Sequence, residues 1–190
     1  MTLITPEELQ KLLELQGVAS SELEDLTNLQ NLIDLKISEI TALTGLAVNP
    51  VTRKQIIKNF NNDVFETDWY PINRICSFKI DGVDITSDDY VLDENSGIIY
   101  FNVIRNGLLV IEYINKLSDE VITAKINPLI SDMVLYGFTS PTKGEGEISS
   151  IHEAEQSISY DTSNSLGNRI HARINGLKSS YSSCRVKWLV

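Results

Sequence analysis

The feature that most constrains this chain is the stretch 70–116, in which apolar and polar residues alternate with the period of a β-strand. On both sides of it, apolar residues recur at steps of three and four, which is the period of a helix. Since one segment cannot satisfy both periods, the chain must combine helices with a separate sheet. We therefore predict an α+β fold, in which an antiparallel β-meander is inserted into a mainly helical core of three to four helices.

Turn-forming residues divide this stretch into strands. Asp81-Gly82 and Asn106-Gly107 are dipeptides that favour tight hairpins, and residues 93–97 form a run of turn formers that includes a glycine. Four or five antiparallel strands follow from these signals, at residues 72–80, 83–86, 90–92, 98–103 and 108–114.

Capping signals mark the starts of four helices. Thr5-Pro6-Glu7-Glu8 is a capping box with proline at the first helical position, and Ser21-Glu22-Leu23-Glu24 repeats the box. Ser118 can cap a third helix that is apolar nearly all round. Pro128 should kink or divide that helix, because proline lacks the N–H that the helix needs. The predicted helices are residues 6–16, 21–44, 118–137 and a last helix that Ser163 or Asn164 caps and that ends near Gly176.

The remaining segments carry weaker signals. Residues 46–69 indicate a connection with one short strand, residues 139–147 a surface loop, and residues 148–160 an extended segment or a frayed helix. We expect the chain to divide into a helical core of residues 1–62 and 117–177, an inserted β lobe of residues 63–116, and an extended C-terminal docking tail of residues 178–190.

Nothing in the sequence predicts a membrane span or secretion. Residues 1–4 lack the basic start of a signal peptide, and no apolar run approaches the ~20 residues of a membrane helix. We expect a soluble protein made inside the cell. In that setting Cys76 and Cys184 are expected to be free thiols, with Cys76 on the apolar face of its strand beside Phe78 and Ile80.

Charge is distributed unevenly along the chain. Residues 162–190 contain five basic residues and no acidic one, whereas the preceding residues contain 11 basic and 26 acidic residues. A body with this excess of carboxylates should repel the phosphates of DNA, since DNA binding depends on lysine and arginine. We therefore expect the basic segment to dock on an acidic protein surface, with Trp188 and Leu189 as an apolar anchor. The basic residues of this docking surface are Arg169, Arg173, Lys178, Arg185 and Lys187.

The sequence offers no constellation for catalysis. His152 and His171 have no second histidine or cysteine at metal-ligand spacing, so we expect no metal site and no cofactor. There is no nucleophile elbow, and Gly144-Glu145-Gly146 lacks the lysine of a phosphate-binding loop. We expect a protein without enzymatic activity. The turn carboxylates do not have the spacing of an EF-hand loop, and we interpret them as solvated: Asp81, Asp84, Asp88, Asp89, Asp93 and Glu94.

The order of these signals resembles the head-tail connector family of tailed bacterial and archaeal viruses. The resemblance rests on Leu43-Thr44-Gly45 at the end of the long helix, Tyr70-Pro71-Ile72 at the entry to the sheet, Ser96-Gly97-Ile98-Ile99 within it, and residues 157–161 before the last helix. It implies a dodecameric ring that docks beneath the portal protein in the virion neck after assembly in the host cytoplasm. A stopper or tail terminator protein would bind on the tail side, and the C-terminal segment would reach into the portal.

The resemblance also gives the acidic body a role. A channel lined with carboxylates offers DNA no counterion-releasing contacts, so DNA would slide through without specific binding. The candidate channel residues are Glu24, Asp25 and Asp34 on the long helix.

Two alternatives stay open. The chain could form another neck ring or a tail-completion ring, which differs in the partner that it binds. It could instead be a module whose β lobe binds carbohydrate or a host surface, which requires exposed aromatic residues for stacking. The aromatic candidates are Tyr90, Tyr100, Phe101 and Tyr113, and their places in an apolar alternation favour core or interface positions.

Overall fold

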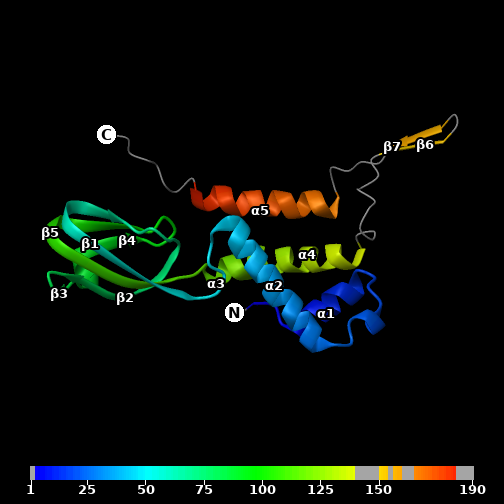
Figure 1. Cartoon of the computed structure of the whole chain (residues 1–190), viewed down its shortest axis with the longest axis horizontal. Coiled ribbons are helices and arrows are strands. Elements are labelled where there is room, and N and C mark those ends of the chain that lie inside the picture. Colours follow the sequence, from blue (N-terminus) through cyan, green and yellow to red (C-terminus); the bar gives the residue numbers. More distant parts are fainter. Residues whose placement is uncertain (1–2, 140–149, 154–155, 160–164, 183–190) are drawn as a thin grey trace.

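The computed structural model describes residues 3–139, 150–153, 156–159 and 165–182. They form a helical body and a β lobe that lie end to end, which confirms the predicted α+β fold with an inserted antiparallel sheet (Figure 1). The helices are α1 (Pro6–Leu15), α2 (Leu26–Thr44), α3 (Asp119–Val121), α4 (Asn127–Thr139) and α5 (Leu166–Ser182), with shorter segments η1 (Ser20–Glu22), η2 (Ser87–Asp89) and η3 (Ile122–Ile126). The strands are β1 (Val51–Glu66), β2 (Ile72–Ile80), β3 (Val83–Asp84), β4 (Tyr90–Asp93), β5 (Ile98–Asn115), β6 (Ser150–Glu153) and β7 (Gln156–Ser159).

Local caps set the ends of the first two helices. The Thr5 hydroxyl accepts a hydrogen bond from the Glu8 amide, and the Glu8 carboxylate accepts one from the Thr5 amide, so the predicted capping box of α1 is confirmed. The second box is wrong. Residues 20–22 form a 3-10 turn, and α2 begins only at Leu26, because the Asp25 carboxylate caps the amides of Thr27 and Asn28. Gly45 ends α2 in the left-handed conformation, with φ of 73°.

The irregularity expected at Pro128 lies just before it. Ser118 caps α3, and the chain then passes through η3, a π-helical turn, into α4. The π turn moves the backbone bonding from i−4 to i−5, as in the bond from the Asn127 amide to the Ile122 carbonyl. This shift accommodates the N–H that Pro128 lacks. The helix continues past Gly137 to Thr139.

Helix α5 is longer than predicted. It continues to Ser182 instead of ending near Gly176, because Leu177 and Tyr181 are buried on the same face as Ile174. Lys178 is therefore helical, whereas an extended segment was expected to begin there.

Strand β5 organises the lobe. It spans 18 residues and pairs with β1 on one side and with β2 and β4 on the other, so the strand order is β1-β5-β2-β3. The sheet is antiparallel but is not the predicted meander, because β5 lies between β1 and β2, and two further predictions fail here. β1 spans 16 residues, where one short strand was expected, because it pairs with β5 along its length. Asn106-Gly107 is not a hairpin, since both residues pair with β1 inside β5.

Gly107 does not form a turn, but its lack of a side chain lets the Asp81 carboxylate lie close to β5. Its φ is 128°, and a Cβ atom at this position would collide with the Asp81 carboxylate. That carboxylate accepts a 2.7 Å hydrogen bond from the Leu108 amide, which ties the β2–β3 turn to β5.

The lobe has two layers, because β1 and β5 bend together. The register shifts after Ile57 and again after Asn62, and Asn59 lies at positive φ within the first shift. Phe78 of β2 and Tyr90 of β4 are consequently in contact, at 5.5 Å between ring centroids, although their strands are not paired. Layer one comprises residues 51–57 of β1, residues 109–115 of β5, β2 and β3, and layer two comprises residues 60–66 of β1, residues 98–105 of β5 and β4.

A register shift also explains the position of Cys76. The pairing of β2 with β5 is irregular between Ile75 and Ser77, so Cys76 is exposed instead of joining Phe78 on the apolar face. Cys76 is a free thiol, whereas Cys184 lies outside the described residues.

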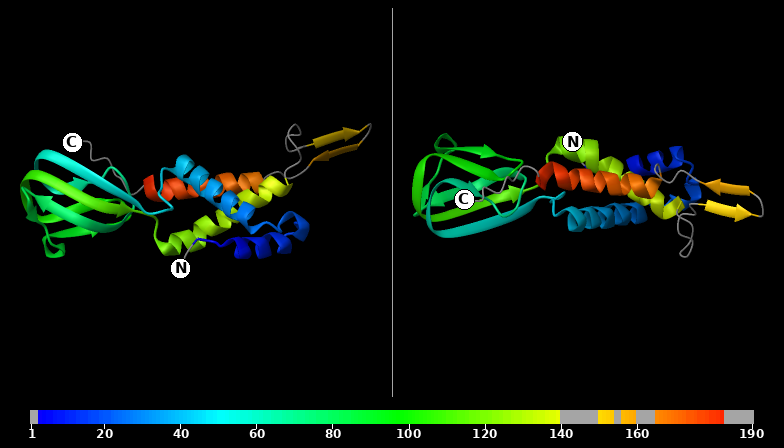
Figure 2. Two further views of the ribbon diagram at one scale, coloured as in Figure 1. Left: turned by 60° about the horizontal axis from the view of Figure 1, so that its bottom comes forward. Right: turned by 90° about the horizontal axis from the view of Figure 1, so that it is seen from above.

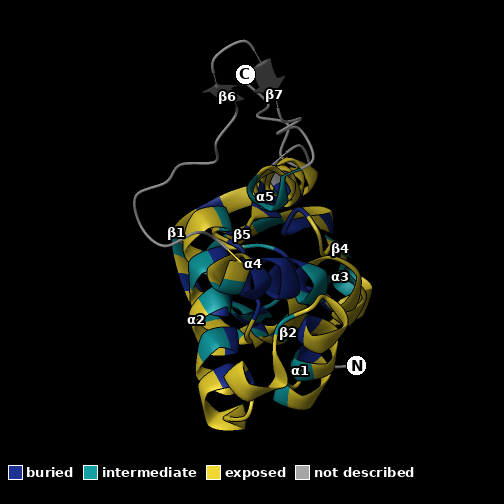
Figure 3. Cartoon of the chain, turned by 90° about the vertical axis from the view of Figure 1, so that its right-hand side faces the viewer, coloured by how far each residue is buried: buried dark blue, intermediate teal, exposed yellow. Residues whose placement is uncertain are grey.

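The body and the lobe have separate cores. In the body, α4 is the most buried helix, as expected, with every residue from 129 to 135 buried (Figure 3). It packs against α1, α2 and α5.

Residues 150–153 and 156–159 form the antiparallel pair β6 and β7, so this segment is extended and is not a frayed helix (Figure 2). Among the described residues, no helix combines the length and apolarity that a membrane crossing needs.

Candidate interaction surfaces

Two of the predicted docking arginines contact the body of the same chain. Arg169 and Arg173 lie one helical turn apart on α5, and both face Asp132 of α4. The Arg173 Nε atom is 3.3 Å from Asp132 Oδ2, and the Arg169 Nη2 atom is 3.6 Å from Asp132 Oδ1. The Asp132 side chain is only 9% exposed, whereas those of Arg169 and Arg173 are 53% and 40% exposed. The two arginines thus neutralise a buried carboxylate and hold α5 on α4.

Sequence reasoning missed this cluster. Its only signal is an acidic residue, Asp132, inside a helix that is otherwise apolar on nearly every side. A carboxylate is rarely buried without a partner, so the partner could have been sought among basic residues spaced by one helical turn. Arg169 and Arg173 have that spacing.

The other docking candidates fall into two groups. Lys178 is exposed in the C-terminal part of α5, and that end of the helix is the one nearer to the β lobe (Figure 1). Arg185, Lys187, Trp188 and Leu189 lie outside the described residues.

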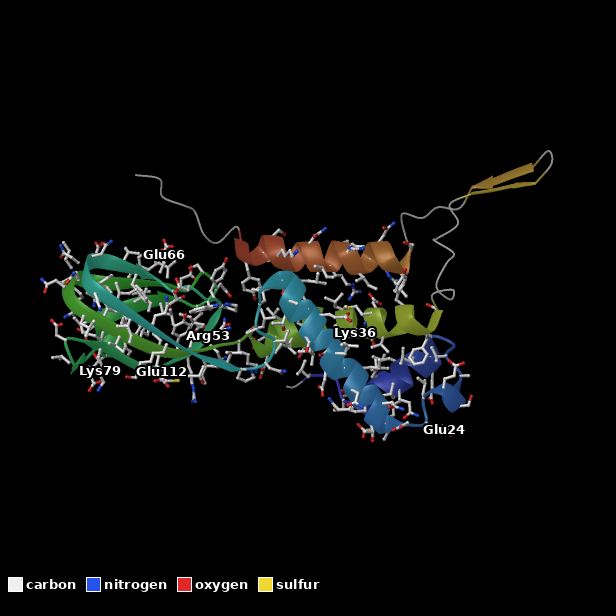
Figure 4. The ribbon with its side chains drawn as sticks, viewed as in Figure 1. Glu24, Lys36, Arg53, Glu66, Lys79 and Glu112 are labelled. Atoms are coloured by element: carbon white, nitrogen blue, oxygen red, sulfur yellow. The ribbon has the colours of Figure 1, made fainter. Side chains whose placement is uncertain are left out.

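The three acidic channel candidates differ in their local roles. Asp25 caps α2, and it also accepts a hydrogen bond from the side chain of Asn28. Asp34 is exposed on α2, where it accepts a 2.9 Å hydrogen bond from Gln30. Glu24 is exposed just before α2, at the end of the body that is remote from the lobe (Figure 4). All three are at the surface, and Asp25 alone has a structural role in its helix.

The β lobe does not present the aromatic platform of a carbohydrate site. Phe101 and Tyr113 are buried in the lobe core, and Tyr90 packs half-buried against Phe78. Of the four candidates, Tyr100 is the exposed one, at 45%. Trp69 is 39% exposed, but the guanidinium of Arg53 covers its ring at 4.6 Å from the centroid.

Charged contacts in the lobe are local. The Asp89 carboxylate accepts hydrogen bonds from the Thr86 hydroxyl and amide and forms a 2.6 Å ion pair with Arg105. The bonds from Thr86 and then the contact with Arg105 lower the pKa of Asp89. Burial raises the pKa of Tyr113, whose hydroxyl donates a hydrogen bond to Gln55. The bonds of Thr86 close the η2 turn, while the contacts of Arg105 and Tyr113 join parts of the lobe that are distant in sequence.

The described residues hold no group of three or more histidine, cysteine, aspartate or glutamate side chains that could bind a metal ion. A hollow of about 620 Å³ lies on the surface of layer two and is lined by Asn62, Val64, Glu66, Ile98 and Tyr100. This lining carries one carboxylate and no base or nucleophile beside it.

Comparison with known proteins finds a solved structure with a similar fold. A chain in the neck of an empty GTA (gene transfer agent) particle, computed with C6 symmetry, has a similar structure, with a TM-score of 0.52 and 12% sequence identity. The similarity covers 75% of this chain and 82% of that chain. No protein-family model and no curated protein matches the sequence. At this identity, what the two chains share is their fold.

Proposed function

We propose that this chain is a structural, non-enzymatic subunit of a particle neck, namely a head-tail connector. It forms a ring beneath the portal, extends the DNA channel and joins the packaged head to the tail. The observation that carries this proposal is the fold shared with a chain of a GTA neck over most of both chains. The β lobe, whose core is separate from that of the body, also supports a structural role.

In this proposal the portal is bound mainly by basic residues other than Arg169 and Arg173. Because Arg169 and Arg173 already neutralise that carboxylate, less of their charge is left for a partner. The docking surface then consists mainly of Lys178, Arg185, Lys187, Trp188 and Leu189, which would bind an acidic portal surface around an apolar anchor. The opposite end of the ring would bind a stopper or tail terminator protein.

Native mass spectrometry of the purified chain, alone and with a portal ring, tests the proposal. A version that ends at Ser182 is the matched control, since it keeps the buried face of α5 and removes only residues 183–190. We expect the full chain to bind the portal ring in a defined number of copies and the shortened chain to lose that binding. A full chain that remains monomeric at every concentration and does not bind the portal would refute the function.

The channel residues are tested separately. Glu24→Lys and Asp34→Lys place a positive charge on exposed positions, and they should slow DNA ejection if these side chains line the channel. Asp25→Lys is a poor probe, because losing an N-cap alone destabilises a helix by about 1 kcal/mol. Unchanged ejection kinetics in the Glu24 and Asp34 variants would exclude them from the channel wall.

A further inference from the structure

The outer surface of layer two is apolar and acidic. Cross-strand pairing puts Val91, Tyr100 and Val64 side by side on it, and the next row is formed by Asp93, Ile98 and Glu66. Val91 is 63% exposed and Tyr100 is 45% exposed, while the alternate residues Ile99 and Phe101 point into the lobe core. These two rows carry two carboxylates and no basic residue, and they border the hollow of about 620 Å³. Ile98 is itself buried, at 9%, and we call the other five residues the acidic face.

The outer surface of layer one has the opposite charge. Its pairing rows are Thr52, Ile114 and Arg74, then Lys54, Glu112 and Ser77, then Ile56, Val110 and Lys79. Three of these nine residues are basic and one is acidic, and the third row continues to a second acidic residue, Asp84 of β3, opposite Lys79. Lys79 also forms an exposed ion pair with Asp84. Ile56 is 54% exposed between the lysines. We call these nine residues the basic face.

The two faces lie on opposite sides of the lobe. The lobe core lies between the layers, where Phe60 and Phe101 of layer two contact each other and Phe101 also contacts Phe78 of layer one. Figure 4 shows Glu66 on the upper side of the lobe and Lys79 and Glu112 on the lower side. A second copy of the chain can therefore meet the acidic face of the first with its own basic face, and its acidic face is left free for a third.

We propose that the acidic face of one subunit binds the basic face of the next copy of this chain. The contact pairs opposite charges around exposed apolar residues on both sides, which overcomes locally the repulsion between acidic bodies. Since the two faces differ, the contact is heterologous, and repeating it gives a closed ring when the rotation from one subunit to the next divides a full turn. The inference rests on the proposed ring function, and it specifies which surfaces join the subunits.

Two double variants reverse one face each. E66K/V91K changes the acidic face, and K54E/I56E changes the basic face; all four side chains are exposed. In either variant alone, each contact would pair like charges, so we expect the subunit concentration at half assembly to rise by roughly 10- to 100-fold. An equimolar mixture restores opposite charges at every contact. It should form rings that contain equal numbers of the two variants, which native mass spectrometry resolves.

A third variant, V83K/D88K, makes the same kind of exchange outside both faces and should assemble like the wild type. Thermal unfolding checks that all variants fold. Assembly of either face variant alone at wild-type concentration, loss of assembly in V83K/D88K, or a mixture of folded variants that stays monomeric overturns the contact and leaves the neck function standing. All measurements are repeated on a portal ring. A wild-type chain that assembles in neither setting overturns both the contact and the proposed function.

Discussion

The helical body and the β lobe are held together in different ways. The buried cluster of the body contains 21 residues, nearly all aliphatic, whereas that of the lobe contains 10, of which Phe60, Phe65, Phe78, Phe101 and Tyr113 are aromatic. Over the described residues the two clusters share no member. The body neutralises its buried Asp132 with two arginines of α5, while in the lobe the outer surfaces of the two layers differ in charge. The charged contact of the body thus holds its own helices together, whereas the proposed contact uses charges of the lobe to bind a neighbouring subunit.

The largest effect should come from testing whether the two cores are independent. Ile130→Ala in the body and Ile111→Ala in the lobe each remove a fully buried side chain, which costs about 2–5 kcal/mol of unfolding free energy. If the cores are separate units, hydrogen exchange should accelerate only in the unit that carries the substitution. Equal acceleration in both units after either substitution would show one cooperative core.

The arginine cluster should give the next largest effect. Replacing Arg169 and Arg173 together with alanine leaves the Asp132 carboxylate buried without a counter-charge. We expect a loss of about 1–3 kcal/mol, less than for a fully buried pair, because both arginines are partly exposed. Adding Asp132→Leu to this variant should restore part of the loss, since an apolar side chain suits that site.

Chemical denaturation of the wild type, the double variant and the triple variant measures these changes in unfolding free energy. A triple variant that is less stable than the double variant would show that Asp132 contributes through other contacts. Arg53→Ala serves as a control outside the body, since that guanidinium stacks on Trp69 of the lobe segment.

A pair of glycine substitutions should change stability in opposite directions. Gly107→Ala forces a side chain into positive φ and against the Asp81 carboxylate, and we expect a loss of about 1–3 kcal/mol. Gly137→Ala lies in helix α4 with open space at the Cβ position, and it should stabilise the body by about 0.4–1 kcal/mol. Thermal unfolding of the two variants measures both changes. A neutral Gly107→Ala would mean that the Asp81 turn can move away from β5.

The same contrast between the two regions explains which predictions from sequence succeeded. Helix ends depend on residues close in the chain, so Thr5, Gly45 and Ser118 could be identified as caps. Asp25 caps α2 by the same local chemistry, but the box at Ser21 fits the capping pattern equally well, so the sequence does not distinguish the two starts. The turn signal at Asn106-Gly107 was misleading for the opposite reason. Gly107 adopts its conformation beside a register shift that depends on pairing with the distant strand β1.

The sequence predicts the charge of the segments that form the candidate surfaces, but it does not predict where those segments lie in the fold. The sequence shows that residues 162–190 are basic, but contact with Asp132 depends on how α5 packs against α4. Likewise, the acidic and basic faces of the lobe arise from the register of β1 against β5. Lys54 and Glu66 belong to the same strand, β1, but lie on different faces because the register shifts between them. The sequence does not show where these shifts occur.

The smallest expected effect is a separate acid dependence in each region. Hydrogen bonds from Thr86 and the contact with Arg105 lower the pKa of Asp89 in the lobe, and the hydrogen bond and charge of Lys116 lower that of Asp119 in the body. A lowered folded-state pKa contributes stability above the ordinary carboxyl pKa, and that contribution is lost as the pH falls through the folded-state value. Asp89→Asn should therefore weaken the acid dependence of the lobe alone, and Asp119→Asn that of the body alone. Residue-resolved hydrogen exchange between about pH 5 and pH 3 measures both. A single substitution that alters the acid dependence of both regions would mean that they unfold together, in spite of their separate cores.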